Sequence, residues 1–160
     1  DMWAFDYLEK EVGVQIYRAP IERTWNNKKF FIGHGDGLGP GDYTYKILKS
    51  MFANKLCQWA FARIHPNLGM GIANFWSRRS RLANSGNDEI FNGEENEFLL
   101  SFCKDKIKAS HFDYFVFGHR HLPLNLKVSN TSTYYNLGEW VSQCNYLMFD
   151  GDKCEMKEFK

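Results

Sequence analysis

The stretch DYFVFGHRHLP, residues 113–123, decides how this chain is organised. Residues 114–117 are short, aromatic and uncharged, which is typical of a strand buried on both faces. Gly118 then permits a tight turn or the close approach of another backbone. If the chain stays extended beyond it, His119 and His121 point the same way, roughly 7 Å apart. Two such imidazoles can each hold a different ion of a close metal pair, provided that other ligands join them.

A second segment repeats this pattern. FFIGHGDG, residues 30–37, is again an apolar strand followed by Gly-His and a polar loop, so His34 matches His119 in context. Ligands at the ends of adjacent buried strands suit a metal centre because rigid elements hold them. One histidine at a strand end is more often structural, but three in two matching contexts favour a metal site. His65 precedes a proline and His111 precedes a strand, so neither is a candidate.

The rest of the chain predicts a layered α/β (α+β) domain, because strands alternate with helices and several strands end the chain. At 160 residues, 44% of them hydrophobic, the chain suits one domain with its own core. Spacing and capping signals predict helices over residues 1–12, 43–64, 68–81 and 92–109, the last opened by a capping box at Asn92 and Glu95. Extended segments are predicted over residues 14–20, 21–25, 28–34 and 113–119, with a turn at 26–27 and a final hairpin at Asp150-Gly151.

Charge is unevenly distributed along the chain. Residues 43–83 carry seven basic side chains and no acidic one, which leaves 13 basic and 19 acidic residues elsewhere. This asymmetry predicts an anionic partner for the basic segment. The same segment carries aromatic side chains at helical spacing, namely Phe52, Trp59, Phe75 and Trp76. They either contact lipid or pack on the body of the protein, and in the second case the charges form a solvated face.

Other features bound the setting of the protein. Its four cysteines form no C-x-x-C pair, which predicts reduced core thiols of a cytosolic protein, with structural zinc a minor alternative. No run approaches the roughly 20 apolar residues of a membrane span, and we expect no signal peptide. The chain starts at Asp1 rather than at a methionine, so we expect it to be a fragment.

GHGD at residues 33–36 and GHRH at residues 118–121 resemble the two C-terminal metal motifs of calcineurin-like metallophosphoesterases. Two earlier family motifs, D-x-H and G-D-x-x-D, have no counterpart here, and Asp1 fits the last residue of the third, G-N-H-D/E. The resemblance covers residues 1–160 but only the C-terminal portion of the family domain. It implies a metallophosphoesterase-type β-sandwich flanked by helices, with a helical lid insertion at about residues 43–83.

Within this family, HGDGLGPGD at residues 34–42, followed by a basic insertion and GHRHLP, is most similar to one subfamily. That subfamily hydrolyses the pyrophosphate bond of UDP-2,3-diacylglucosamine in lipid A biosynthesis, giving UMP and 2,3-diacylglucosamine 1-phosphate. The resemblance implies two divalent metal ions, usually Mn²⁺. It also implies a cytoplasmic protein on the inner face of the cytoplasmic membrane, with a UDP-linked diacylated glucosamine as partner, an anionic membrane surface under the lid, and no nucleic acid.

The resemblance assigns roles residue by residue. His34 and His119 would bind one ion and His121 the other, which makes them the catalytic metal ligands. Arg120 stands where the family varies and receives no role. Asp42 matches a substrate-contacting aspartate, and Ser85 stands in a stretch like the family's A-N-S, which implies a second substrate contact. Substrate phosphates or anionic headgroups would face the arginines of the insertion, Arg78, Arg79 and Arg81.

Three alternatives remain at this stage. One keeps the metals but replaces the lipid by a soluble nucleotide or another phosphodiester. Another is a catalytically silent scaffold of the same fold. Nucleic-acid binding through the basic segment is a weaker idea, because no recognised reading motif surrounds it. Because half of the family's ligands are missing, we expect the 160 residues alone to bind metal poorly and to hydrolyse nothing.

Overall fold

The computed structural model describes residues 7–39, 43–84 and 90–159. It divides the chain into two compact units. A helical unit comprises residues 1–16 and 41–86, and a sheet unit comprises residues 17–40 and 87–160. The helical unit thus contains the segment for which the sequence predicted an insertion, and the sheet unit contains all three candidate histidines.

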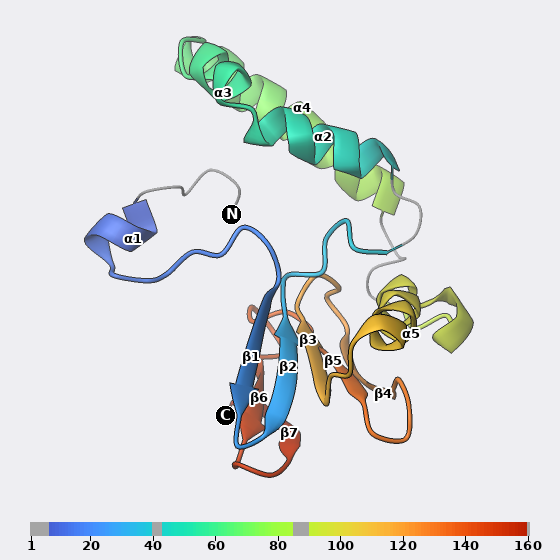
Figure 1. The fold of residues 1–160 in the computed structure, drawn as a ribbon. Coiled ribbons are helices and arrows are strands. Elements are labelled where there is room, and N and C mark those ends of the chain that lie inside the picture. The colour runs from blue at the N-terminus through green and yellow to red at the C-terminus, as the bar shows by residue number, and fades with distance from the viewer. Residues whose placement is uncertain (1–6, 40–42, 85–89, 160) are drawn as a thin grey trace. The chain divides into compact units, whose positions relative to one another are not determined.

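A five-stranded mixed sheet forms the centre of the sheet unit (Figure 1). Its strand order is β1-β2-β3-β5-β4. The strands span Ile21–Trp25 (β1), Lys28–Ile32 (β2), Tyr114–Phe117 (β3), Pro123–Lys127 (β4) and Thr133–Leu137 (β5). β3 pairs in parallel with both β2 and β5, whereas β1 and β4 are antiparallel to their neighbours. The carboxyl ends of β2, β3 and β5 therefore lie at one edge of the sheet, where loops can bring side chains together.

Helix α5, Phe98–Ala109, covers one face of this sheet, and a short 3-10 turn, Glu94–Asn96, precedes it. The core between helix and sheet is aromatic. The Phe31 ring lies 5.4 Å from that of Phe112 and 5.7 Å from that of Phe115, centroid to centroid, at tilted or edge-on angles that aromatic pairs favour. The other buried members include Leu99, Leu100, Cys103, Phe117 and Tyr134.

A hairpin of β6, Asn145–Phe149, and β7, Cys154–Glu158, packs on the opposite face. Phe149 contacts the Phe30 ring at 5.1 Å, and the Tyr135 hydroxyl donates a hydrogen bond of 3.0 Å to the Cys154 carbonyl. Burial raises the pKa of the Cys154 thiol to about 11. Helix α5 and the β6–β7 hairpin thus cover the two faces of the sheet, which explains why the aromatic strand β3 carries no charged side chain.

Four helices make up the described part of the helical unit: α1 (Tyr7–Glu11), α2 (Tyr43–Ala53), α3 (Lys55–Phe61) and α4 (Pro66–Asn84). α2 and α4 run alongside each other (Figure 1), and the rings of Phe52 and Trp76 lie 6.3 Å apart between them. Many apolar side chains of these helices are exposed, among them Trp59 and Phe75. In the described part of the chain, no helix combines the length and the apolar character needed to cross a bilayer.

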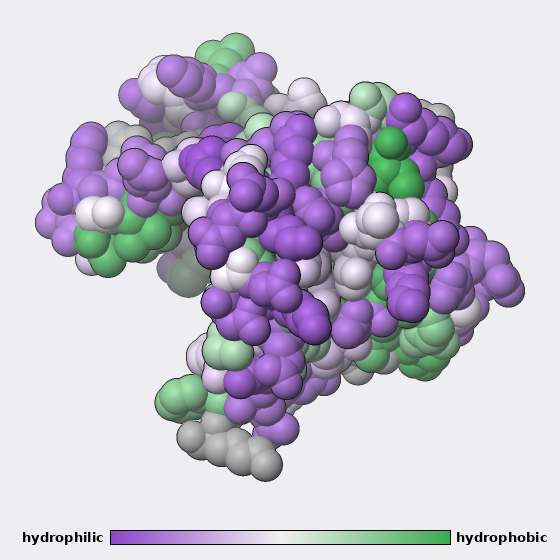
Figure 2. Space-filling model, turned by 60° about the horizontal axis from the view of Figure 1, so that its bottom comes forward, coloured by the Kyte–Doolittle hydropathy of each residue, from purple (hydrophilic) through white to green (hydrophobic). Residues whose placement is uncertain are grey.

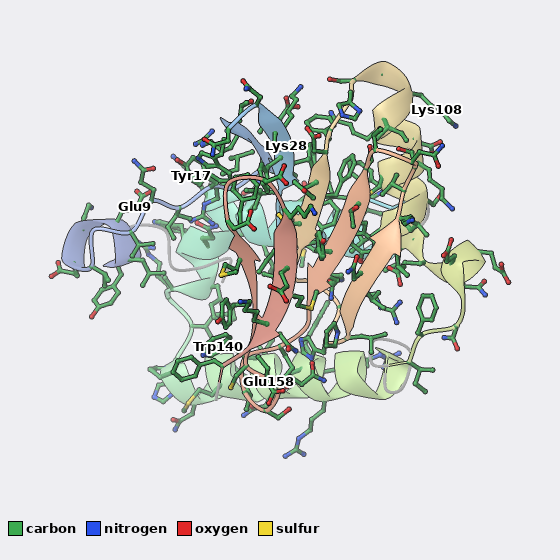
Figure 3. All side chains as sticks on the ribbon, turned by 90° about the horizontal axis from the view of Figure 1, so that it is seen from below. Glu9, Tyr17, Lys28, Lys108, Trp140 and Glu158 are labelled. Atoms are coloured by element: carbon green, nitrogen blue, oxygen red, sulfur yellow. The ribbon has the colours of Figure 1, made fainter. Side chains whose placement is uncertain are left out.

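The face of the molecule in Figure 2 is mostly hydrophilic, with smaller hydrophobic areas set apart from one another. One exposed loop of the sheet unit, residues 138–144, contains Trp140, which lies beside the end of β7 near Glu158 (Figure 3). The Trp140 ring is 6.2 Å from that of Phe159. Glu139 orders this loop because its carboxylate accepts hydrogen bonds from the backbone N–H groups of residues 141–143.

The mixed α/β class is confirmed, and so are the turn at residues 26–27 and the final hairpin. Two helix predictions were wrong in detail. The predicted helix 43–64 is interrupted at Asn54, whose side chain accepts hydrogen bonds from the first N–H groups of α3. α5 begins at Phe98 rather than at a capping box, because residues 94–96 form a 3-10 turn. The segment 14–20, predicted to be extended, contains no strand.

The cysteine prediction was wrong for three of the four residues. All four are free, but Cys57 is exposed, and Cys144 and Cys154 are half-buried. Cys103 alone among them is a buried core thiol, and burial raises its pKa well above the ordinary range. Residues 1–6 of the predicted N-terminal helix lie outside the described residues, and the rest of that prediction corresponds to α1.

Candidate metal centre

His34 and His119 come together because their loops follow neighbouring parallel strands. The hydrogen bonds between β2 and β3 continue past both strand ends, from the Gly33 N–H to the Val116 carbonyl at 3.1 Å and from the Gly118 N–H to the His34 carbonyl at 3.0 Å. The two loops are thus paired by their own backbone. As a result, the imidazole rings of His34 and His119 lie 5.2 Å apart, centroid to centroid, at an angle of 81°.

Gly35 makes this approach possible. Its φ of +109° is a conformation that glycine adopts more readily than other residues. A Cβ atom at this position would lie only 3.1 Å from the Cβ atom of His119 and 3.1 Å from a methyl group of Leu99. A larger residue would therefore push the His119 loop away from the His34 loop. This steric limit explains why position 35 is a glycine.

His121 has a different environment. β3 ends at Phe117, and residues 119–122 form bends rather than continuing the strand. The extended geometry that would place His119 and His121 on one side is therefore not adopted. His119 is half-buried, Arg120 is buried and His121 is exposed. The structure thus pairs His34 with His119, and the metal role of His121 stays a prediction.

Sequence reasoning missed the part played by Arg120. This residue is 5% exposed, and its Nη1 atom forms an ion pair with a carboxylate oxygen of Glu97, which is 1% exposed. Its Nη2 atom donates a hydrogen bond of 2.7 Å to the Ile90 carbonyl. Burial, followed by the nearby charge of Glu97, raises the pKa of Tyr134, whose hydroxyl donates to Glu97. No sequence signal marks Arg120 as buried, since a charged residue between two histidines is typical of solvent exposure.

The predicted substrate residues all belong to the helical unit or its ends. Asp42 and Ser85 lie outside the described residues. Arg78 and Arg79 are exposed on α4, and Arg81 lies in the same helix, with its side chain outside what the structure describes. Their contact with a substrate stays a prediction.

The histidine pair fits part of a metal centre. Two imidazoles bound to one ion, each at about 2.1 Å, have ring centroids roughly 5 Å apart, and the separation of 5.2 Å between His34 and His119 agrees with this. Within the described ranges, however, no group of three or more histidine, cysteine, aspartate or glutamate residues could hold an ion.

Comparison with known proteins adds one relative. No family model matches the chain. The chain is 28% identical over 163 residues to a UDP-2,3-diacylglucosamine hydrolase from Porphyromonas gingivalis, in an alignment that covers 94% of this chain. This chain resembles a hydrolase. It spans 62% of the length of that relative, so the relative's activity as a whole protein belongs to the proposal below.

Proposed function

We propose that this chain forms part of a metal-dependent hydrolase that cleaves the pyrophosphate bond of UDP-2,3-diacylglucosamine. Water would add its oxygen to the α-phosphorus, the bond from that phosphorus to the bridging oxygen would break, and UMP and 2,3-diacylglucosamine 1-phosphate would leave. The observation that carries the proposal is the pairing of His34 with His119 at adjacent strand ends. Similarity to a hydrolase named for this substrate supports the choice of substrate.

The chain's own residues would hold and orient the reacting groups. Neutral imidazoles of His34 and His119 would donate lone pairs to one ion, and His121 would serve a second. In such a site, divalent ions, here Mn²⁺ by resemblance, supply positive charge that lowers the pKa of water and stabilises phosphoryl oxygens. Strands β2 and β3 keep the paired imidazoles in place, because both loops are tied by backbone hydrogen bonds.

The helical unit would bind the lipid part. Its helices α2, α3 and α4 expose aromatic side chains such as Trp59 and Phe75 in a segment that carries only basic charges. Apolar rings beside Arg78 and Arg79 suit acyl chains next to phosphates, and they also suit an anionic membrane surface. We therefore propose that these helices act as a lid, and that the protein binds peripherally to the inner face of the cytoplasmic membrane.

A catalytically silent scaffold is the second candidate. It accounts directly for the lack of a three-ligand group among the described residues. A hydrolase of soluble nucleotides is a third possibility, but it would have no use for a lid of exposed aromatic and basic side chains. The same experiment separates the three.

The test uses the full-length gene product with UDP-2,3-diacylglucosamine and Mn²⁺, followed by phosphorus NMR. We expect release of UMP. In a His119→Ala variant, the rate should fall by at least about 100-fold, because loss of a residue that only supports a ligand already costs 10–100-fold. His111→Ala is the matched control and should keep the wild-type rate, since His111 is exposed and precedes β3, at the opposite end of the strand from the paired loops.

The other outcomes each favour a different candidate. Cleavage of a soluble phosphodiester without cleavage of the lipid substrate would keep the metal site and reject the lipid. No cleavage of either substrate, with or without Mn²⁺, would reject the hydrolase and favour the scaffold.

A further inference from the structure

We propose that Arg120, Glu97 and Asn136 form a buried clamp that fixes the orientation of His119 and His121. In this view Arg120 is a positioning residue rather than a catalytic one. The effect of the clamp on metal binding rests on the proposed function. Its effect on the two imidazoles does not.

Charge burial is the first argument for the clamp. The side chain of Arg120 is 6% exposed and that of Glu97 is 0% exposed, and the two form an ion pair. Burying two charges costs free energy that their attraction often fails to exceed, and a well-packed apolar pair is commonly as stable. An ion pair of this kind is therefore poorly explained by stability alone. Its directional hydrogen bonds, from Nη1 to Glu97 and from Nη2 to the Ile90 carbonyl, fix a geometry that an apolar side chain would leave free.

The backbone on both sides of His121 is held as well. Asn136, which is fully buried at the end of β5, donates two hydrogen bonds from its Nδ2 atom. One reaches the Arg120 carbonyl at 2.5 Å, and the other reaches the Leu122 carbonyl at 2.7 Å. The exposed His121 therefore sits between two anchored peptide groups, although its own side chain is at the surface.

The start of α5 connects this clamp to the other histidine loop. Glu97 is the residue before the helix, and the next two residues contact both loops. The Phe98 ring lies 6.2 Å from the His119 ring, centroid to centroid. Leu99 lies against Gly35, beside His34. The start of α5 thus contacts both histidine loops, and the ion pair fastens the GHRH loop to it.

The experiment measures the imidazoles directly, by NMR of histidine Cε1–H groups in the carbon-labelled full-length protein. Two variants disturb the ion pair in different ways. Arg120→Lys keeps the positive charge but lacks the planar fork that reaches two acceptors at once. The double variant Glu97→Leu, Arg120→Met replaces the pair by apolar side chains and leaves no buried charge unpaired. Leu100→Ala, a change in the core on the same helix, is the control for loss of stability alone.

We expect the His119 and His121 signals of both clamp variants to move toward their positions in unfolded peptides, while the His65 and His111 signals stay in place. In Leu100→Ala all four should stay. Mn²⁺ affinity, measured by calorimetry, should fall 10–100-fold in the clamp variants and less than about twofold in the control.

Two results would overturn the inference: wild-type His119 and His121 signals in both clamp variants, or an equal shift in Leu100→Ala. The metal measurement keeps the two proposals apart. If the wild-type protein binds no Mn²⁺ but the signals respond as expected, the metal centre is rejected and the clamp stands. If Mn²⁺ binds equally well in all variants and the signals do not move, the clamp is rejected and the metal centre stands.

Discussion

The two units of this protein use the same residue types in opposite ways. In the sheet unit, Phe115 is 0% exposed and Phe31 is 5% exposed, whereas in the helical unit Phe75 is 60% exposed and Trp59 is 55% exposed. The sheet unit derives its stability from packed rings covered on both faces. The helical unit leaves large apolar side chains in water, which costs free energy unless another surface covers them. Aromatic residues therefore form a core in the sheet unit, whereas in the helical unit they are exposed and carry the binding surface proposed above.

The charged residues show the same contrast. Arg120 is buried and paired with Glu97, whereas Arg79 is exposed in a segment without acidic residues. An arginine with a buried partner fixes local geometry, while an exposed arginine in a basic segment contributes to a field that attracts anions. Environment, rather than residue type, separates the positioning role from the proposed binding role.

The largest expected effect comes from removing one ring in each unit. Phe115→Ala should lower the free energy of unfolding by about 3–5 kcal/mol, because it leaves a cavity among Phe31, Phe112 and α5. Phe75→Ala, the matched change at an exposed site, should change it by less than about 0.5 kcal/mol. Urea denaturation of both variants and the wild type measures the difference. A Phe75→Ala loss as large as that of Phe115→Ala would mean that the helical unit also relies on a packed core, and the contrast would fail.

A smaller effect is expected on binding to an anionic lipid surface when two positive charges are removed from α4. Each basic residue near an anionic membrane contributes about 1 kcal/mol to binding, so Arg78→Ala with Arg79→Ala should weaken binding to phosphatidylglycerol vesicles by about 30-fold. Lys104→Ala with Lys108→Ala removes equal charge from exposed positions on α5 of the sheet unit and should change binding little. Vesicle cosedimentation at low salt measures both. Equal losses in the two double variants would indicate a general charge effect rather than a binding face on α4.

The sequence predicted the strands better than the site. Short apolar runs such as residues 30–32 and 114–117 had few alternatives, because uncharged runs that end at a glycine suit buried strands. The same pattern placed His34 and His119 at the ends of adjacent strands, and the parallel pairing of β2 with β3 brings their loops together. The sequence was therefore sufficient to predict features that depend on neighbouring residues or on which strands are adjacent.

Long-range pairing explains what the sequence did not reveal. Arg120 finds its partner Glu97 at the start of a helix 23 positions earlier in the chain, and nothing in either residue's neighbours marks that contact. Asn136 likewise holds a loop that precedes its own strand. Helix α5 was predicted to begin near Asn92, because Asn92 and Glu95 match a capping box, yet residues 94–96 form a 3-10 turn and the helix begins only at Phe98. Burial of a charge is a property of the folded arrangement rather than of spacing.

The smallest expected effect concerns residues 138–144, an exposed loop of the sheet unit. Hydrogen bonds to the Glu139 carboxylate order this loop, so exposed segments of the two units also differ. A hydrogen bond from the Ser142 hydroxyl, with further ones from nearby backbone N–H groups, holds the pKa of Glu139 below its ordinary value near 4.5. A carboxyl group whose pKa is lower in the folded state contributes stability above the unfolded pKa and loses it as the pH falls through the folded pKa. Wild-type stability should therefore decline below about pH 4.5 more steeply than that of Glu139→Gln.

Thermal unfolding between pH 3 and pH 7 measures this difference, and Ser142→Ala supplies the matched variant. It keeps the carboxylate but removes the hydroxyl donor, so its acid dependence should fall between those of the wild type and Glu139→Gln. Parallel curves for all three proteins would show that the loop is ordered without help from the Glu139 charge. A steeper wild-type curve would show that hydrogen bonds to one carboxylate order this surface loop, so that in the sheet unit an exposed segment is held in place by its own residues.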